Sequence, residues 1–319
     1  MRQAGRYMPE YRALRERHTL LEICASPDLA TEVTLQPVRR IEVDAAILFS
    51  DLLLPLAPMG LAFDFIKGEG PQIEHPIESP ADIDKLKLFE PREALSHVLE
   101  AITLVQHELN GRVPLIGFSG APFTLASYAI EGGHSNNFAR TKSLMYGHPE
   151  AWHRLCDKFA TVVADYLVAQ IDAGVDAVQL FDSWVGTLSA ADYREFALPH
   201  SQKIFQAIAG RVPSLHFGTG TSTIFEELRE AGGDVIGVDW RIDLDVARKR
   251  LGKKPVQGNL DPVLLFSSKK VLRAAVKDIL SRNGKRNGHI FNLGHGILPG
   301  TPVENVEYVA TCVHEMTAK

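Results

Sequence analysis

Asp51 is the one carboxylate inside the almost wholly apolar run that Asp44 opens, DAAILFSDLLLPL over residues 44–56. The run lacks the period-two alternation of a half-solvated strand, which indicates a strand buried on both faces, as in a parallel sheet. Asp51 would then lie at the carboxyl end of a core strand, where α/β proteins place their chemistry. The alternative roles for such a carboxylate are a cap on the next turn or an ion pair with an arginine.

Arginines dominate the first 18 residues, where Gly5 and Pro9 predict a loop followed by a helix that starts at Pro9. Guanidinium forks match carboxylates and phosphates in bidentate fashion, so a pocket with several arginines suits a polycarboxylate or phosphate ligand. We expect Arg2 and Arg6 to bind such a ligand and Arg12 and Arg17 to be solvated surface side chains. A second helix is predicted from Ser26, with Ser26 as the N-cap and Pro27 at the first helical position.

Seven short apolar stretches, each ending in small or polar residues and most followed by a helical pattern, predict a parallel α/β fold. They are the Asp51 strand and residues 113–122, 175–183, 212–220, 235–240, 255–262 and 289–296. We interpret residues 1–319 as one (β/α)₈ TIM-type barrel domain whose first strand lies upstream of Met1, with insertions at 60–80 and 128–150. A doubly wound sheet is the alternative, but no GxGxxG follows a first strand.

Barrel strands all point the same way, so the polar residues at their carboxyl ends share one rim. These residues are Asp51, Ser119–Gly120, Ser183, His216–Gly218, Asp239–Trp240, Asn259 and His295. Tyr128 lies on a helix that Pro122 can begin, and its phenol could reach the same pocket, although a core position is commoner for tyrosine. For Ser183 a helix N-cap is an equally plausible role, and for His295 a ring bonded to backbone.

Composition excludes several classes of protein. The chain has 319 residues, 45% hydrophobic and 23% charged, with a formal net charge of −5, which fits a globular protein and not a nucleic-acid binder. No apolar run is long enough to span a bilayer and no signal sequence is present, which predicts a cytosolic protein without membrane contact. Cys24, Cys156 and Cys312 are far apart, which argues against disulfides and a structural zinc site.

Seven segments resemble, in order, the signature segments of the uroporphyrinogen decarboxylase family: RQAGRYMPEYR, FSDLLLPL, GFSGAPFTLASYAIEGG, LFDSWVG, GVDW, QGNLDP and NLGHGILPGTP. The resemblance covers nearly the whole chain. It implies a distorted barrel, a homodimer, and no metal or organic cofactor. It also implies the decarboxylation of the four acetate side chains of uroporphyrinogen III, which gives coproporphyrinogen III for haem and chlorophyll synthesis.

The same resemblance implies roles for the matching residues. Arg2 and Arg6 would bind substrate carboxylates, with Arg2 also a proposed proton donor, and Asp51 would hold the pyrrole N–H groups. Tyr128, Ser183 and His295 would line the cleft, and Tyr128 and His295 are the other candidate donors. Without a cofactor, the pyrrole ring itself must accept the electron pair left by carbon dioxide, which it can do once a ring carbon is protonated. We expect Asp51 to act as an anion that stabilises this cation, not as a general base.

Two other functions remain open. Zinc-dependent methyltransferases that act on corrinoid proteins are barrel relatives with an H-x-C pair and a later cysteine as ligands. Here the corresponding segment is His216–Phe217–Gly218, and Cys312 lies in the last predicted helix. The other alternative is a non-catalytic binder of tetrapyrroles or polyanions. Asp182 and Trp184 flank Ser183 at positions where relatives vary, which affects the detail of the cleft.

Overall fold

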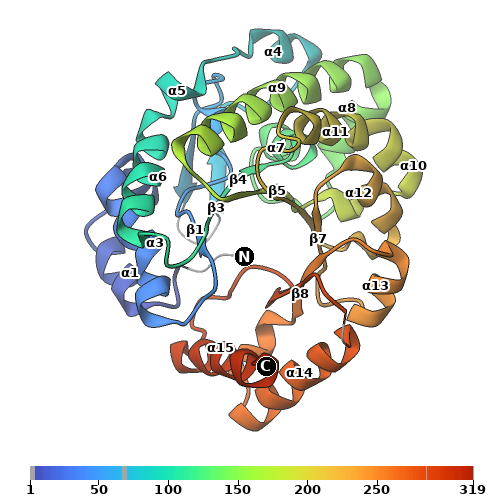
Figure 1. Ribbon diagram of the computed structural model, residues 1–319. Coiled ribbons are helices and arrows are strands. Elements are labelled where there is room, and N and C mark those ends of the chain that lie inside the picture. The colour runs from blue at the N-terminus through green and yellow to red at the C-terminus, as the bar shows by residue number, and fades with distance from the viewer. Residues whose placement is uncertain (1–3, 67–69, 285, 319) are drawn as a thin grey trace.

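Seven parallel strands form one curled sheet inside a ring of helices (Figure 1). The computed structural model describes residues 4–66, 70–284 and 286–318. The sheet order is β1-β4-β5-β6-β7-β8-β9, so each strand pairs with the next along the sheet. The strands are β1 (Ala46–Ile47), β4 (Leu115–Gly120), β5 (Ala177–Asp182), β6 (Ser214–Gly218), β7 (Val235–Gly237), β8 (Val256–Leu260) and β9 (His289–Leu293). Each falls within one of the seven predicted stretches, which confirms the parallel α/β prediction.

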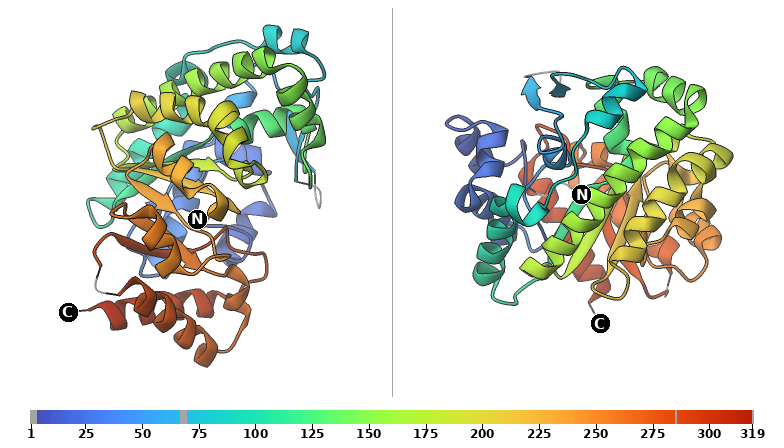
Figure 2. Two further views of the ribbon diagram at one scale, coloured as in Figure 1. Left: turned by 90° about the vertical axis from the view of Figure 1, so that its right-hand side faces the viewer. Right: turned by 90° about the horizontal axis from the view of Figure 1, so that it is seen from above.

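The helices form the outer wall around this sheet, as Figures 1 and 2 show from three sides. The longer ones are α3 (Pro27–Arg40), α6 (Ser96–Leu109), α7 (Pro122–Glu131), α8 (Ala139–Gly147), α9 (Pro149–Ala173), α11 (Leu198–Ala207), α13 (Leu244–Leu251), α14 (Lys269–Asn283) and α15 (Val303–Thr317). The shorter ones are α1 (Pro9–Arg15), α2 (Leu20–Ala25), α4 (Pro80–Lys85), α5 (Pro91–Ala94), α10 (Ala190–Asp192) and α12 (Phe225–Ala231). Among the described residues, no helix is long and apolar enough to cross a membrane.

Local sequence signals explain several helix ends. The Ser26 hydroxyl accepts the N–H of Leu29 at 3.4 Å, and Pro27 occupies the first turn of α3, as predicted. Helix α9 ends at Gly174, which adopts a left-handed conformation with φ 114° and so closes the helix without a Cβ clash.

The first strand is shorter than predicted. Backbone pairing of β1 with β4 ends when the Leu48 N–H donates to the Ile116 carbonyl at 3.0 Å. The next N–H, of Phe49, donates instead to the Thr34 hydroxyl of α3 at 2.9 Å. The chain therefore leaves the sheet at residue 49, and Asp51 lies in the loop after the strand.

The N-terminal segment packs between the two ends of the sheet. Tyr7, Met8 and Tyr11 belong to a small buried hydrophobic cluster, separate from the main core, that also contains Val33 of α3 and Val303 of α15. The guanidinium of Arg40 on α3 bonds Glu10 of α1 at 2.5 Å and Glu307 of α15 at 3.0 Å. Because α3 lies beside β1 and α15 follows β9, these contacts join the first and last units of the sheet.

An antiparallel hairpin forms within the predicted insertion at 60–80. Strands β2 (Phe63–Ile66) and β3 (Gly70–Ile73) pair with each other and stand apart from the main sheet. The N–H of Ile73 donates to the Gly132 carbonyl at 2.7 Å, and the N–H of Ile77 to the Ala129 carbonyl at 2.8 Å. The hairpin and the segment that follows it are therefore anchored to the C-terminal end of α7.

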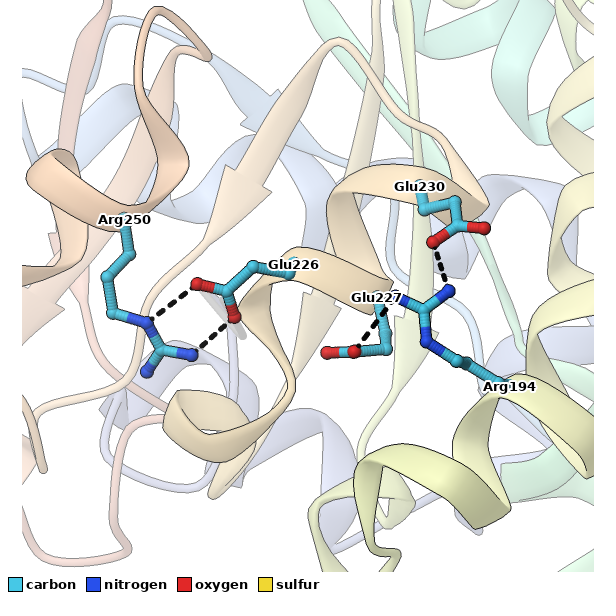
Figure 3. Close-up of polar contacts among 5 residues, drawn as sticks. All are labelled: Arg194, Glu226, Glu227, Glu230 and Arg250. Carbon is cyan, nitrogen blue, oxygen red and sulfur yellow. Dashed lines mark hydrogen bonds and ion pairs between the residues drawn. The ribbon is translucent and has the colours of Figure 1, made fainter.

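Ion pairs join neighbouring helices of the outer wall (Figure 3). Glu226 on α12 accepts two bonds from the Arg250 guanidinium of α13, at 2.9 Å and 2.5 Å. Glu227 and Glu230, on the same helix, both pair with Arg194 of the π-helix η3 (Tyr193–Ala197). Helix α12 is thus tied to the unit before it and the unit after it.

Candidate active site

Asp51 occupies the loop between β1 and the 3₁₀ helix η1 (Leu54–Leu56) and is half-buried. Its Oδ1 accepts the N–H of Leu53 at 2.9 Å. The carboxylate therefore does cap the next turn, the alternative considered for it from the sequence. This bond fixes the orientation of the carboxylate relative to the turn.

Arg6 lies in the loop before α1, and its side chain is exposed. The loop itself is fixed, because the Arg12 guanidinium donates to the backbone carbonyls of Arg6 at 3.2 Å and Tyr7 at 2.8 Å. Arg12 is exposed, as predicted, but it also has this anchoring role, which the sequence did not indicate. Arg2 lies outside the described residues.

Tyr128 lies near the end of α7, a helix that starts at Pro122 as predicted. Its half-buried ring has its centroid 5.9 Å from that of Trp184. Trp184 follows Ser183, which directly follows β5 and is half-buried. The 3₁₀ helix η2 (Val185–Thr187) has Trp184 as its N-cap, so Ser183 does not have the N-cap role considered for it.

His295 lies two residues beyond β9 and is half-buried. Its ring centroid is 6.2 Å from that of Phe217 on β6 and 6.3 Å from that of Trp240, which follows β7. Asp51, Ser183 and His295 therefore all follow strands of the parallel sheet at their carboxyl ends, and Tyr128 lies on the helix that follows β4.

Aromatic rings inside the sheet form an apolar floor below these polar residues. Phe118 of β4 contacts Phe181 of β5 with centroids 5.6 Å apart, and Phe181 contacts Phe217 of β6 at 5.9 Å. The amide of Gln170 on α9 bonds both the N–H and the carbonyl of Phe118 at 2.9 Å, in a part of β4 that extends beyond β1. Such a floor suits a flat, partly apolar ligand and lowers the local dielectric constant.

The sequence missed this floor, although it carried a signal for it. In each of three predicted strands a phenylalanine stands just before the small or polar residues of the carboxyl end: GFSG, LFDS and HFGTG. Their common orientation depends on the register between strands, which pairs Phe181 directly with Phe217.

Some residues expected at the rim face elsewhere. His216 is fully buried against Phe205 of α11, with ring centroids 4.9 Å apart, and burial lowers its pKa to about 4. The prediction that it lies on the rim is wrong because side chains alternate along a strand, and Phe217 takes the inward position. A zinc ligand would have to face the site. His216 faces the helices instead, which argues against the zinc-ligand alternative.

Two further rim candidates have structural partners. The buried Asp239 carboxylate accepts the backbone N–H of Gly220 at 2.6 Å and the Arg241 guanidinium at 2.6 Å. The Asn259 side-chain amide donates to the carbonyls of Asp239 at 3.1 Å and Ile242 at 2.7 Å. These bonds fix the loops after β6 and β7 at the rim, the second of them against strand β8.

Asp182, the last residue of β5, points away from the floor into the helix layer. It is fully buried, and its Oδ1 accepts the hydroxyl of Thr124 on α7 at 3.0 Å. Burial raises the pKa of Asp182 to about 7. Among the described residues, no group of three or more histidine, cysteine or acidic side chains is arranged to hold a metal ion. The three cysteines are free, in line with the prediction against disulfides, and all three are buried.

Fold and site together define a class: a TIM-barrel-like α/β protein with polar side chains over an aromatic floor at the carboxyl ends of its strands. The sequence model of the family described as uroporphyrinogen decarboxylase (URO-D) matches residues 1–316. The chain belongs to this family.

Its relatives include the uroporphyrinogen decarboxylase of Carboxydothermus hydrogenoformans, 55% identical over 100% of this chain and 91% of that protein. The enzyme of that name from Chloroflexus aurantiacus is 55% identical over 98% of this chain and 90% of that protein. The one from Thermus thermophilus is 52% identical over 100% and 93%, respectively.

Solved structures resemble the chain at the level of the fold. A methyltransferase from Methanosarcina mazei superposes with a TM-score of 0.81 at 20% identity, covering 94% of this chain and 88% of that one. A putative vitamin-B12-independent methionine synthase from Listeria monocytogenes has a TM-score of 0.61 at 12% identity, covering 97% and 94%. These likenesses support the barrel-like architecture.

Proposed function

We propose that this chain is a carboxy-lyase that converts uroporphyrinogen III to coproporphyrinogen III and carbon dioxide. The observation that carries the proposal is the family match over residues 1–316, together with relatives of that name at 52–55% identity over nearly the whole chain. No comparable observation favours the corrinoid methyltransferase or the non-catalytic binder.

In the proposed mechanism Asp51 centres the substrate. The substrate is a macrocycle of pyrroles whose N–H groups point inward, and a carboxylate below the ring can accept them. Protonation of a ring carbon makes the pyrrole cationic, and a nearby anion stabilises that charge as it develops. The bond from Asp51 Oδ1 to the Leu53 N–H supports this role, since the carboxylate needs no reorientation during the reaction.

Each decarboxylation consumes one proton and releases one molecule of carbon dioxide. The bond between the acetate methylene and its carboxylate breaks, carbon dioxide leaves, and the electron pair passes into the protonated pyrrole. The methylene carbon takes a proton and becomes a methyl group, and the ring loses the proton it gained. The net change is the replacement of one carboxylate by one hydrogen, which needs no redox cofactor.

The remaining residues are proposed to bind and protonate. Arg2 and Arg6 hold substrate carboxylates, and Ser183 contributes a hydroxyl at the end of β5. Arg2, Tyr128 and His295 are the candidate proton donors. Arginine has too high a pKa to be an efficient acid without special geometry, whereas imidazole changes charge near neutral pH.

We infer that residues 1–319 form one barrel domain that works as a homodimer, as the family resemblance implies, and that the protein is cytoplasmic, as its composition suggests. Sedimentation velocity of the purified protein tests the dimer, and a species of monomer mass at working concentrations would contradict it.

Anaerobic incubation with uroporphyrinogen III, followed by oxidation and chromatography of the porphyrins, tests the activity. We expect successive loss of carboxylates ending at coproporphyrin, without added metal or cofactor. A folded protein that leaves the substrate unchanged would refute the proposal. If uroporphyrinogen stayed unchanged and the protein instead transferred a methyl group to or from a corrinoid protein in the presence of zinc, the methyltransferase would be favoured.

A further inference from the structure

Trp184 stands at the centre of an aromatic cluster beside the candidate site. Its ring lies 5.9 Å from Tyr128 of α7, 5.7 Å from Phe138 at the start of α8, and 6.4 Å from His134 in the loop between those helices. Trp184 itself follows β5 and is half-buried. One indole therefore joins the end of a central strand to the helix that carries a proposed catalytic phenol.

The backbone of Trp184 is anchored to the same helix one turn earlier. Its N–H donates to the Thr124 hydroxyl at 3.3 Å, and that hydroxyl donates to Asp182 Oδ1 at 3.0 Å. Thr124 and Asp182 are both 0% exposed. Thr124 and Tyr128 are four residues apart and so lie on one face of α7. The strand end is thus bound to this face at two points, one polar and one aromatic.

The acid in this anchor is costly to bury. Asp182 Oδ2 has no hydrogen-bond partner among the described residues, and an unsatisfied buried polar atom opposes folding because it loses its bonds to water. Asp182 and Thr124 face away from the aromatic floor, in the layer between β5 and the helices, and so do not line the site. Their bonds act on the Ser183–Trp184 turn that does.

We propose that Trp184 is a positioning residue that holds the Tyr128 phenol at the rim, and that the Thr124–Asp182 pair fixes Trp184 in turn. The inference rests on the proposed function, because it assigns Tyr128 a part in decarboxylation. It predicts that losing the indole weakens catalysis through the Tyr128 hydroxyl and not through general loss of structure.

A double-mutant cycle on decarboxylation tests this route. We expect Trp184→Ala to lower kcat/KM roughly tenfold, because small misplacements of a reacting group are costly. Trp184→Phe should keep most of the kcat/KM that Trp184→Ala loses. In a Tyr128→Phe background, Trp184→Ala should cause little further loss, since the hydroxyl it positions is already gone. Independent, multiplicative losses in the double variant would overturn the proposal.

Thr124→Val tests the anchor without touching the indole. We expect this substitution to lower kcat/KM, as Trp184→Ala does. In the Tyr128→Phe background it should cause little further loss of kcat/KM. Ser127→Ala is the matched control, because Ser127 is a buried hydroxyl on the same helix that donates to the Phe123 carbonyl at 2.8 Å. Equal losses in Thr124→Val and Ser127→Ala would overturn the anchoring role.

A spectroscopic measurement separates this inference from the proposed function. The chain has three tryptophans, so protein labelled with 5-fluorotryptophan should give three fluorine resonances, of which Trp184→Phe identifies one. We expect this resonance to shift in Thr124→Val and Tyr128→Leu and to stay in place in Ser127→Ala. An unmoved resonance overturns the inference whatever the activity. A shifted resonance in a protein without decarboxylase activity supports the contact network and refutes the proposed function.

Discussion

The Asp51 carboxylate is held by its own chain, since Oδ1 accepts the Leu53 N–H at 2.9 Å. The same geometry occurs at Asp261, whose Oδ1 accepts the Val263 N–H at 2.9 Å before the 3₁₀ helix η5 (Pro262–Phe266). Local sequence thus gives both acids a turn-capping role. At the residue scale they differ in their proposed chemistry, because only Asp51 is assigned to the pyrrole N–H groups.

This pairing gives a controlled test of Asp51. Asparagine can still accept the Leu53 N–H but carries no charge, so we expect Asp51→Asn to lower kcat by about 10²-fold or more with little change in melting temperature. Asp261→Asn, the matched control, should keep near-native turnover. If Asp51→Asn retained normal kcat and substrate affinity, the electrostatic role of Asp51 would be wrong.

At the scale of elements, the rim loops depend on contacts between helices of the outer wall. Arg250 of α13 bonds Glu226 of α12 and also donates to the backbone carbonyl of Ser222 in the 3₁₀ helix η4 (Thr221–Thr223). That helix follows Gly220, whose N–H is bonded by Asp239. Arg250 therefore supports the β6 loop from outside while Asp239 supports it from the rim. Figure 3 shows the Arg250–Glu226 pair.

We expect Arg250→Met to destabilise the protein by about 1 kcal/mol. The bidentate geometry favours a measurable contribution, although both side chains are partly exposed, at 32% and 42%. Chemical denaturation measures the effect. The control is Lys249→Met, because Lys249 is exposed on the same helix and forms no ion pair among the described residues. Equal effects of the two substitutions would show that the Glu226 pair contributes nothing.

At the scale of the whole molecule, buried ionisable groups make stability depend on pH in opposite directions. Burial raises the pKa of Asp182 to about 7, so the folded state keeps this proton while the unfolded state loses it near 3.8. The Asp182 contribution therefore falls as pH rises from about 4 to 7. His200 and His216 have pKa values lowered by burial to about 4, so their contribution falls as pH decreases from 6.5 to 4.

Asp182→Asn should isolate the first of these effects. The groups facing Asp182 are Thr124 of α7, Cys156 of α9 and Tyr193 of η3, and none of them carries a positive charge. We expect the variant to gain stability relative to the parent as pH rises from 5 to 8, by up to about 3 kcal/mol, because the folded-state pKa of about 7 lies about two pH units above the lower end of this range. Melting temperatures of both proteins across this range give the comparison. A difference that does not change with pH would mean that Asp182 is not protonated in the folded protein.

Local sequence patterns predict the strands, the parallel class and the family. Apolar runs ended by glycine or polar residues mark the seven strands, and Ser26–Pro27 and Pro122 mark helix starts, because capping and proline geometry are local. These patterns did not predict the hairpin β2–β3 or the short helices α2, α4 and α5. Elements this short are marginal alone and form through packing against neighbours.

Tertiary contacts set which side chains line the site. Asp51 lies beyond a strand that is shorter than its sequence predicts, because Thr34 of α3 takes the Phe49 N–H out of the sheet. His216 and Asp182 face the helices, while Phe181 and Phe217 face inward. Each strand encodes the alternation of its side chains. Which of the two faces points into the barrel depends on the register between strands and on the curling of the sheet, and both arise from contacts between residues far apart in sequence.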